Sequence, residues 1–444
     1  MRFRAYKGNG MTRRLFHCFL IWLVLAFITR HCKASEPRHP LASPPRITHA
    51  IYQAAYNRKL PDDFSVIRAR INTKTGRRIT SSAHAYPYSI NGTDIFTLSP
   101  DGSKLVVSIN RVDPFPGVSD AVRISEPNKY LQSVLDDMAV LNLKTGIWKR
   151  LTRDNAGYTD VVWSSDSKSV AYVSARGVDL SWPPEPREPE WRVYVQNVLT
   201  GRRHTVFQEK FSDKNNLRPD KRLLHWLPGS HRLLYISDNP AGLFLLDAQG
   251  AKPVLLSQHI PAMISVAKRR ILWVEEKMSA DNKTFLSAAI DTALLPSDLN
   301  TFTSATQWSK LPGMKKFVLP TSVVDIVVSP DGCRFAFMSS DPTGKLGVPV
   351  VIDPTNLTVV RLGSFTYFPG DLLWSQNGRY LLYSERKYYN PGRPSKVIAF
   401  PATGGKWRPL ENVDWKQSVA PLKTTVVLDL PEAGSLPFVW QEAK

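Results

Sequence analysis

The sequence predicts an all-β fold in which one four-stranded antiparallel unit recurs around a closed ring, a β-propeller. Short runs rich in Val, Ile, Leu, Tyr and Trp recur between turn residues, and few stretches have a helical period. A strand–turn–strand motif repeats along the chain, and a second hairpin pattern follows most of its copies. The length of 444 residues suits one large array of such repeats.

The first repeating element is a hairpin with a Ser-Pro-Asp-Gly turn. Its clearest copies are centred on Ser99–Gly102 and Ser329–Gly332, each between two apolar runs. Proline fixes the φ that a type I turn requires, and glycine adopts the left-handed conformation that starts the second strand. Weaker copies lie at 164–167, 227–230 and 375–378, while Ile264–Glu275 keeps the strands without the turn residues. We therefore expect six first hairpins.

A second hairpin follows the first in each unit. In Met138–Leu151 the turn is Lys144–Gly146, and a degenerate copy lies at Phe285–Leu295. The other copies are Val193–Phe207, Leu243–Leu256, Val348–Leu362 and Val397–Leu410. Two hairpins make a four-stranded sheet that buries its faces only by stacking radially on its neighbours. We expect six to eight blades, most simply seven.

Segments left over at the two ends of the array predict how the ring closes. Ser65–Ile79 has the pattern of a second hairpin with no first hairpin before it. Residues 415–440, which include Thr424–Leu428, have strand character beyond the last repeat. Pairing both termini in one blade would hide two sheet edges.

The N-terminus has the features of an export signal. Arg13 and Arg14 precede the apolar run Leu15–Ile28, and Cys32 and Ala34 offer small residues before a cleavage point. A helix of this run would extend only about 21 Å, short of the hydrocarbon thickness of a bilayer. We expect a signal peptide over 1–34, a linker over 35–60 and the propeller over 61–440. The protein is expected to be exported to the periplasm or cell envelope, with an uncleaved N-terminal anchor as the alternative.

Charge and composition narrow the possible ligands. The net charge of +20 lies largely in residues 1–80, where sixteen Lys or Arg face three acids, so +7 remains for the rest. No nucleic-acid motif accompanies it, and we expect no nucleic-acid partner. The nine His residues show no metal-ligand spacing, and Cys333 is the one cysteine outside the signal. The sequence also contains no glycine-rich loop of the kind that binds phosphate. No metal or other cofactor is expected.

The repeat resembles a known family. The full pattern begins with an apolar residue, a Ser-Pro-Asp-Gly turn and an apolar strand that ends in serine. A Thr-Gly turn and a strand that ends in Leu-Thr follow. This pattern is similar to the TolB-type propeller repeat. The same repeat builds the N-terminal propeller of prolyl oligopeptidase-family serine peptidases, including dipeptidyl peptidase-like and lasso-peptide isopeptidase-like members. The likeness covers about residues 90–410. Those peptidases add an α/β-hydrolase domain with a Gly-x-Ser-x-Gly motif, which this sequence lacks.

Insertions suggest where a partner would bind. In a propeller the connections between second and third strands, and between blades, emerge on one face. The long ones here follow Ser108, Ser174 and Ser384 and are rich in Arg, Tyr and Trp, as contact sites are. The candidate partner-binding residues are Arg111, Trp182, Arg187, Trp191, Arg386, Tyr388, Tyr389 and Arg393. The alternative is that these aromatic side chains only pack the loops onto the ring.

These observations favour a non-catalytic propeller that recognises a peptide or protein partner. The resemblance implies the substrate-gating part of a peptidase, for which a separately encoded hydrolase is a further candidate partner. The alternatives are a TolB-like envelope scaffold and a propeller enzyme of lyase or lactonase type with a channel site. The residues available for a channel site are Asp94, Asp160, His225, Asp325 and Asp371. Glu275 and Glu276 resemble the paired glutamates of dipeptidyl peptidases, but they directly continue a strand.

Overall fold

The structure is a computed structural model, and all its described residues belong to one compact unit, residues 45–444. The described residues are 47–55, 64–72, 77–85, 95–110, 136–153, 157–176, 190–210, 224–238, 240–258, 261–278, 285–295, 311–340, 346–362, 366–367, 372–375, 377–385, 396–402, 406–413, 415, 426–428 and 433–442.

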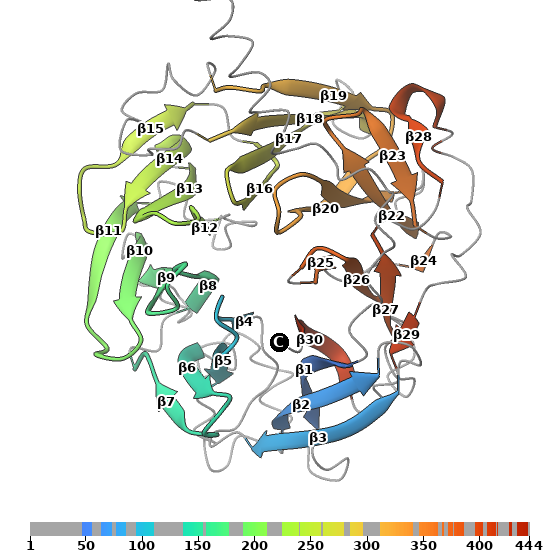
Figure 1. Ribbon diagram of the computed structural model, residues 1–444. Helices are drawn as coiled ribbons and strands as arrows, with labels where there is room; N and C mark the ends of the chain where they lie inside the picture. Colours follow the sequence, from blue (N-terminus) through green and yellow to red (C-terminus); the bar gives the residue numbers. More distant parts are fainter. Residues whose placement is uncertain are drawn as a thin grey trace, which may run out of the picture. The chain divides into compact units, whose positions relative to one another are not determined.

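The described strands form seven antiparallel sheets arranged around one axis, as predicted (Figure 1). Six sheets have four strands, and the remaining one has six. We call them blades 1 to 7 and number them from the first complete repeat. This arrangement confirms the all-β propeller class.

Blades 1 to 3 follow the chain in order. Blade 1 contains β4 (Phe96–Leu98), β5 (Lys104–Asn110), β6 (Asp136–Asn142) and β7 (Trp148–Arg150). Blade 2 contains β8 (Gly157–Trp163), β9 (Ser169–Arg176), β10 (Glu190–Asn197) and β11 (Arg203–Lys210). Blade 3 contains β12 (Leu224–Trp226), β13 (Arg232–Asp238), β14 (Ala241–Asp247) and β15 (Val254–Ser257).

Blades 4 to 7 complete the ring. Blade 4 contains β16 (Met263–Ala267), β17 (Arg270–Met278), β18 (Phe285–Leu294) and β19 (Lys315–Leu319). Blade 5 contains β20 (Val323–Val328), β21 (Phe335–Ser340), β22 (Leu346–Asp353) and β23 (Thr358–Arg361), with β24 (Thr366–Tyr367) and β28 (Arg408–Pro409) added. Blade 6 contains β25 (Leu373–Trp374), β26 (Tyr380–Glu385), β27 (Lys396–Pro401) and β29 (Val426–Leu428). Blade 7 contains β30 (Ala433–Glu442), β1 (Ile47–Ala55), β2 (Phe64–Asn72) and β3 (Arg78–Ala85). A short 3-10 helix, η3 (Leu410–Asn412), follows β28.

The core lies between the blades. Side chains alternate across a strand, so both faces of a blade can be apolar only if each faces a neighbour. On β17, Leu272 and Val274 belong to the cluster shared with blade 5, whereas Ile271 and Trp273 belong to the cluster shared with blade 3. Corresponding clusters join blades 1 and 2, 2 and 3, 5 and 6, and 7 and 1. The apolar runs of the sequence are therefore strands buried on both faces.

Blade 7 confirms the prediction that strands from both termini close the ring. β30 pairs along β1, with Ile51 opposite Val439 and Thr48 opposite Glu442. β2 and β3 supply the hairpin expected around Ser65–Ile79. β1 lies inside the 35–60 segment that the sequence analysis treats as a linker.

Three predicted elements differ from the structure near the end of the array. Val397–Leu410 is not a hairpin: β27 pairs instead with β29, and β28 pairs with β23 of blade 5. Thr424–Leu428 accordingly supplies the outer strand of blade 6 and not part of blade 7. Phe285–Leu295 is one unbroken strand, β18, because no turn residue interrupts it. These pairings link segments distant in the chain, which local turn signals do not report.

Deleting β30 tests the closure. Removal of residues 433–444 strips β1 of the partner to which six of its residues are matched. At about 1 kcal/mol per hydrogen bond, the expected loss is several kcal/mol, seen as a clear drop in melting temperature. Deletion of residues 443–444, which follow β30, is the control and should change little. Equal melting temperatures for both truncations would contradict closure by β30.

Candidate functional site

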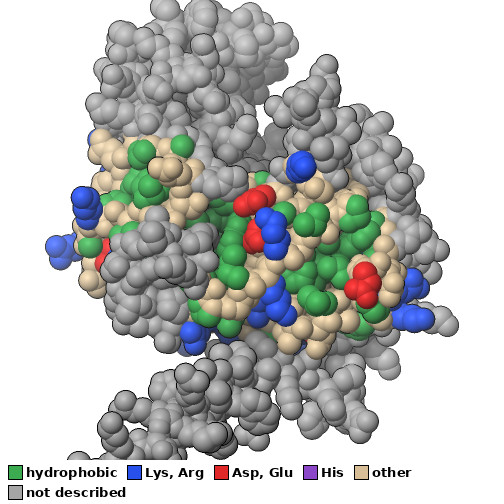
Figure 2. Space-filling view, turned by 90° about the horizontal axis from the view of Figure 1, so that it is seen from above, with side chains coloured by type: hydrophobic (Ala, Val, Ile, Leu, Met, Phe, Trp, Pro, Cys, Tyr) green, Lys and Arg blue, Asp and Glu red, His purple; other side chains and the backbone are tan. Residues whose placement is uncertain are grey.

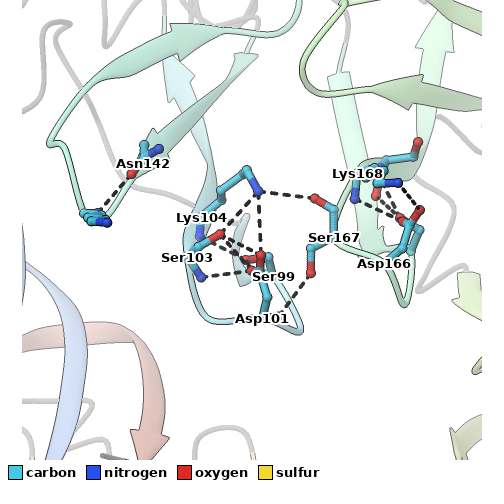
Figure 3. Close-up of polar contacts among 11 residues, drawn as sticks. Ser99, Asp101, Ser103, Lys104, Asn142, Asp166, Ser167 and Lys168 are labelled. Carbon is cyan, nitrogen blue, oxygen red and sulfur yellow. Dashed lines mark hydrogen bonds and ion pairs between the residues drawn. The ribbon is translucent and has the colours of Figure 1, made fainter. Parts of the chain in front are cut away.

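The Ser-Pro-Asp-Gly turns form closed hydrogen-bond networks (Figure 3). The Ser99 hydroxyl donates to Asp101 Oδ1 (2.6 Å) and accepts from the backbone N–H of Lys104 (2.9 Å). Asp101 Oδ1 also accepts from the backbone N–H of Ser103 (3.0 Å). The same serine–acid contact recurs at Ser164 with Asp166 and at Ser329 with Asp331. The motif is therefore satisfied within each turn.

Neighbouring turns also bond to one another from blade to blade. The backbone N–H of Asp101 donates to Ser167 Oγ (3.0 Å), and that of Gly229 donates to Ser165 Oγ (2.9 Å). Arg270, which is buried, donates from Nε to the carbonyl oxygen of Gly332. The polar groups of these turns thus fasten blades 1 to 3, and blades 4 and 5, to each other.

The first and second turns of a blade lie on one face, which we call the turn face. The backbone N–H of Leu143, after β6, donates to the carbonyl of Ser103, before β5 (2.9 Å). Val198 and Lys168 make the equivalent bond in blade 2 (2.9 Å), and Ala248 and His231 make it in blade 3 (2.7 Å). Blade 5 has Pro354 at this position, which has no N–H to donate.

The turn network makes the stability of the fold sensitive to acid. Burial alone would raise the pKa of Asp101, but hydrogen bonds from Ser99 and Ser103 and the charge of Lys104 lower it to about 2. A carboxylate with a folded pKa below its unfolded value near ~3.9 stabilises the fold above about pH 4. That contribution is lost as the pH falls through the folded pKa. The pKa of Asp331 is lowered by its serine in the same way, against the effect of burial.

Asp101→Asn tests this linkage. The variant keeps an acceptor oxygen but has no charge to protonate, so its melting temperature should fall less than that of the unsubstituted protein between about pH 4 and pH 2. Glu411→Gln, at an exposed position of η3, is the control. Parallel melting curves for all three proteins across this window would show that Asp101 makes no such contribution.

The polar residues at the starts of the first strands mainly link blades. Asp160 and Asp325 both have positive φ (51° and 54°) at irregularities in β8 and β20. Asp325 Oδ2 accepts from the backbone N–H of Leu372 in blade 6. The indole N–H of Trp374 in turn donates to the carbonyl of Val327 (3.1 Å). Asp94 and Asp371, the other acids predicted here, lie outside the described residues.

His225 on β12 is a second polar group near the axis. It hydrogen-bonds the backbone of Ile264 in blade 4, and its Nε2 atom is buried with no hydrogen-bond partner among the described residues. Burial lowers the pKa of His225 to about 4, partly offset by the bond to Ile264. The imidazole is therefore neutral in the folded protein at neutral pH.

A neutral buried histidine also makes stability depend on pH. Because the unfolded state binds a proton near its ordinary pKa of ~6.5 and the folded state does not, stability should decrease as the pH falls from about 6.5 to about 4. His225→Gln should flatten this part of the melting-temperature profile. His231→Gln, in an exposed turn position of the same blade, is the control and should keep the slope. An unchanged slope in His225→Gln would assign the pH dependence to other groups.

Glu275 belongs to a charge cluster on blade 4. Lys316 Nζ lies 3.6 Å from Glu275 Oε2 and 3.4 Å from Asp291 Oδ2. Burial raises the pKa of Asp291, and Glu275 adds to this while Lys316 opposes it. These cross-strand ion pairs match the alternative that Glu275 is part of a strand. The side chain of Glu276 is outside the described residues.

The structure describes one of the eight predicted partner-binding residues. Trp191, at the start of β10, is buried in the core between blades 2 and 3 together with Val173 and Tyr235. This placement matches the alternative in which an aromatic side chain packs the loop base onto the ring. The others lie outside the described residues: Arg111, Trp182, Arg187, Arg386, Tyr388, Tyr389 and Arg393.

A buried carboxylate near the same loop base was not predicted from the sequence. Glu209, on the outer strand β11, accepts hydrogen bonds from Tyr235 Oη (3.2 Å) and Ser237 Oγ on β13. Its side chain is buried between blades 2 and 3. Because side chains alternate along β11, Glu209 lies on the same face of the strand as Phe207. This spacing is the feature of the sequence that could have predicted the burial of Glu209.

Long connections are not confined to one face, contrary to the sequence prediction. The segments 111–135, 177–189 and 211–223 leave blades 1 and 2 on the face opposite the turns. However, 295–314 and 402–425 connect third to fourth strands in blades 4 and 6, and therefore leave from the turn face. The sequence analysis predicted hairpins at Phe285–Leu295 and Val397–Leu410, and it therefore did not predict the long connections that follow the third strands of these two blades.

Within the described residues, no group of three or more His, Cys, Asp or Glu is placed to bind a metal ion. The search for membrane-crossing helices in the same part of the chain found none of sufficient length and apolarity. The expected signal, residues 1–34, lies outside the described residues.

Comparison with known proteins finds similarity to solved structures but to no family model. No protein-family model matches it, and no curated protein sequence matches it. The β-propeller domain of the Trilobed protease from Pyrococcus furiosus is similar at 9% identity over 84% of this chain and 97% of that one, with a TM-score of 0.46. Acylaminoacyl peptidase from Pyrococcus horikoshii is similar at 11% identity over 83% of this chain, with a TM-score of 0.47, and the match spans 51% of its length. TolB from Acinetobacter baumannii is similar at 14% identity over 82% of this chain and 81% of that one, with a TM-score of 0.37.

Propellers of peptidases and TolB, the proteins that the repeat resembles, are thus among the similar structures. At these identities the likeness concerns the fold alone, and no activity is transferred from it. The class of the protein is a β-propeller of six four-stranded sheets and one six-stranded sheet, as its own strand pairing defines.

Proposed function

We propose that the protein is an exported, non-catalytic propeller that recognises a peptide or protein partner through the face opposite the turns. The observation that carries this proposal is that polar groups described outside these connections form hydrogen bonds within the ring. Asp325 bonds a neighbouring blade, and the turn serines and acids bond within and between turns. These groups maintain the ring, so recognition is assigned to the inserted connections.

The bases of two inserted connections support the proposal. Segment 111–135 follows β5 and segment 177–189 follows β9, so they leave adjacent blades on the same face. The predicted residues Arg111, Trp182 and Arg187 lie in these two segments. The strands that carry them are anchored by Val106 and Tyr172, both buried in the shared core of blades 1 and 2. Binding residues on connections held by a rigid scaffold are a common arrangement.

The composition of the connections supports a peptide or protein ligand over a small molecule. Arg, Tyr and Trp are the residues that dominate the binding free energy of protein interfaces. Trp182 lies among prolines, and Tyr388 and Tyr389 lie between Arg386 and Arg393. A separately encoded hydrolase remains within this proposal as one kind of protein partner.

Two alanine variants test recognition. The purified protein is used to select binders from a displayed random-peptide library, and affinity for the selected peptide is compared in Trp182→Ala and Tyr388→Ala. A recognition residue should weaken binding by roughly thirtyfold or more, as hot-spot residues do, with an unchanged melting temperature. Val318→Ala, at a 64% exposed position on the outer wall, is the matched control.

Two results would count against the proposal. If no peptide family is enriched, or if both variants bind the selected peptide like the unsubstituted protein, the face does not recognise peptides through these residues. If both variants lower the melting temperature by several degrees, the aromatic side chains pack the connections onto the ring.

A further inference from the structure

One described segment of blade 6 crosses onto the outer side of blade 5. It comprises residues 406–413 and 415, which follow β27, and we call it the strap. Within it, β28 pairs with β23, the fourth strand of blade 5 (Figure 1). Among the described sheets, blade 5 is the one whose fourth strand has a further strand beside it. Blades 5 and 6 both have four strands without β28, so the blade pattern is complete without the strap.

The strap contacts the core on both sides of blade 5. Trp407 packs against the cluster shared by blades 5 and 6, whereas Leu410, Val413 and Trp415 pack against the cluster shared by blades 4 and 5. The ring of Trp415 stacks on that of Phe337, with 6.4 Å between the ring centroids and 26° between the ring planes. A tryptophan of the strap therefore lies against the core on each side of the blade.

Few backbone hydrogen bonds hold the strap in place. The ladder between β28 and β23 matches two residue pairs, and one of the residues in it, Pro409, has no N–H to donate. The backbone N–H of Leu410 donates to the carbonyl oxygen of Leu357 at the tip of blade 5 (2.9 Å). The 3-10 helix η3, which follows, has no side-chain hydrogen bond at its N-cap.

The strap also lies at the surface. Each of its described residues is exposed or half-buried, whereas residues of the core that it covers, such as Phe337 and Val359, are buried. Figure 2 views the molecule from the top of Figure 1, the side on which β19 lies, and shows hydrophobic side chains at the surface among acidic and basic ones. A segment with few backbone bonds and no buried residue opens at a lower free energy than the core strands unfold.

Opening of the strap would uncover two features that together bind peptides. The outer edge of β23, at Thr358 and Val359, would lose its ladder partner. The apolar surface under Leu410, Val413 and Trp415 would face water. A strand edge beside an apolar surface binds extended peptides by β-augmentation, in which main-chain bonds supply affinity and side-chain contacts supply specificity.

We propose that the outer side of blade 5 is an acceptor site for an extended peptide and that the strap occupies this site reversibly in cis. The peptide carries an aliphatic residue, a β-branched residue three positions later and a tryptophan two positions beyond it, as Leu410, Val413 and Trp415 do. This chemistry is inferred from the strap because the strap is the segment seated on the site. A free peptide binds the open fraction of the protein, so the strap lowers the apparent affinity in proportion to its closure.

Hydrogen exchange of the full chain tests whether the strap opens by itself. The backbone N–H of Leu410 bonds to the tip of blade 5, and that of Phe337 lies in the centre of the blade. Leu410 should exchange at least about a hundredfold faster than Phe337, because it needs the strap to open and not the ring to unfold. Equal protection of the two amides would show that the strap opens only with the ring.

A labelled peptide of residues 405–417 tests the acceptor site in trans. The full-length variant Trp415→Ala lacks the ring that stacks on Phe337, so its strap should open more often. It should therefore bind the peptide at least about tenfold more tightly than the unsubstituted protein, as measured by fluorescence anisotropy. Asn412→Ala, at an exposed position of η3, is the matched control and should bind like the unsubstituted protein.

Substitutions in the peptide test the chemistry of the ligand. With the Trp415→Ala protein as the receptor, a peptide that carries Trp415→Ala should bind at least about tenfold more weakly than the unsubstituted peptide, as expected when an aromatic anchor is lost. A peptide that carries Asn412→Ala should bind normally. The bound peptide should also slow hydrogen exchange in β23, which locates it on the edge that the strap occupies.

The proposal is overturned if the Trp415→Ala protein does not bind the peptide, or if it binds both substituted peptides equally. If this variant does not fold, Val413→Ala, a smaller truncation in the same contact, replaces it as the receptor. The recognition test relies on Trp182 and Tyr388, which lie outside the strap and blade 5. A peptide bound through those residues should not be displaced by the strap peptide, so the two proposals can fail separately.

Discussion

Among the described residues, the fold depends on apolar clusters that are buried between neighbouring blades. A four-stranded sheet with apolar residues on both faces is unstable alone, and a linear stack of such sheets would leave one face exposed at each end. Closing the ring removes both exposed faces. The pairing of β30 with β1 is the step that achieves this, because it commits the two ends of the chain to one sheet.

The same constraint accounts for where polar residues lie. Between apolar faces, some buried polar groups bond across to the next blade, as Asp325 does with Leu372 and Glu209 does with Tyr235. At the turn face the Ser-Pro-Asp-Gly network serves the same purpose at the surface. Many conspicuous polar residues of this sequence therefore maintain the ring.

The sequence by itself determined the blades whose signals are local. A Ser-Pro-Asp-Gly turn such as Ser329–Gly332 sets its hairpin within a few residues, so those copies were predicted correctly, as was the closure of the ring by the two termini. Only the tertiary structure decided that β28 joins blade 5, that β29 completes blade 6 and that Trp191 is a core residue. These placements became visible only in three dimensions, because the packing of adjacent blades, and not the local sequence, sets which strands are neighbours.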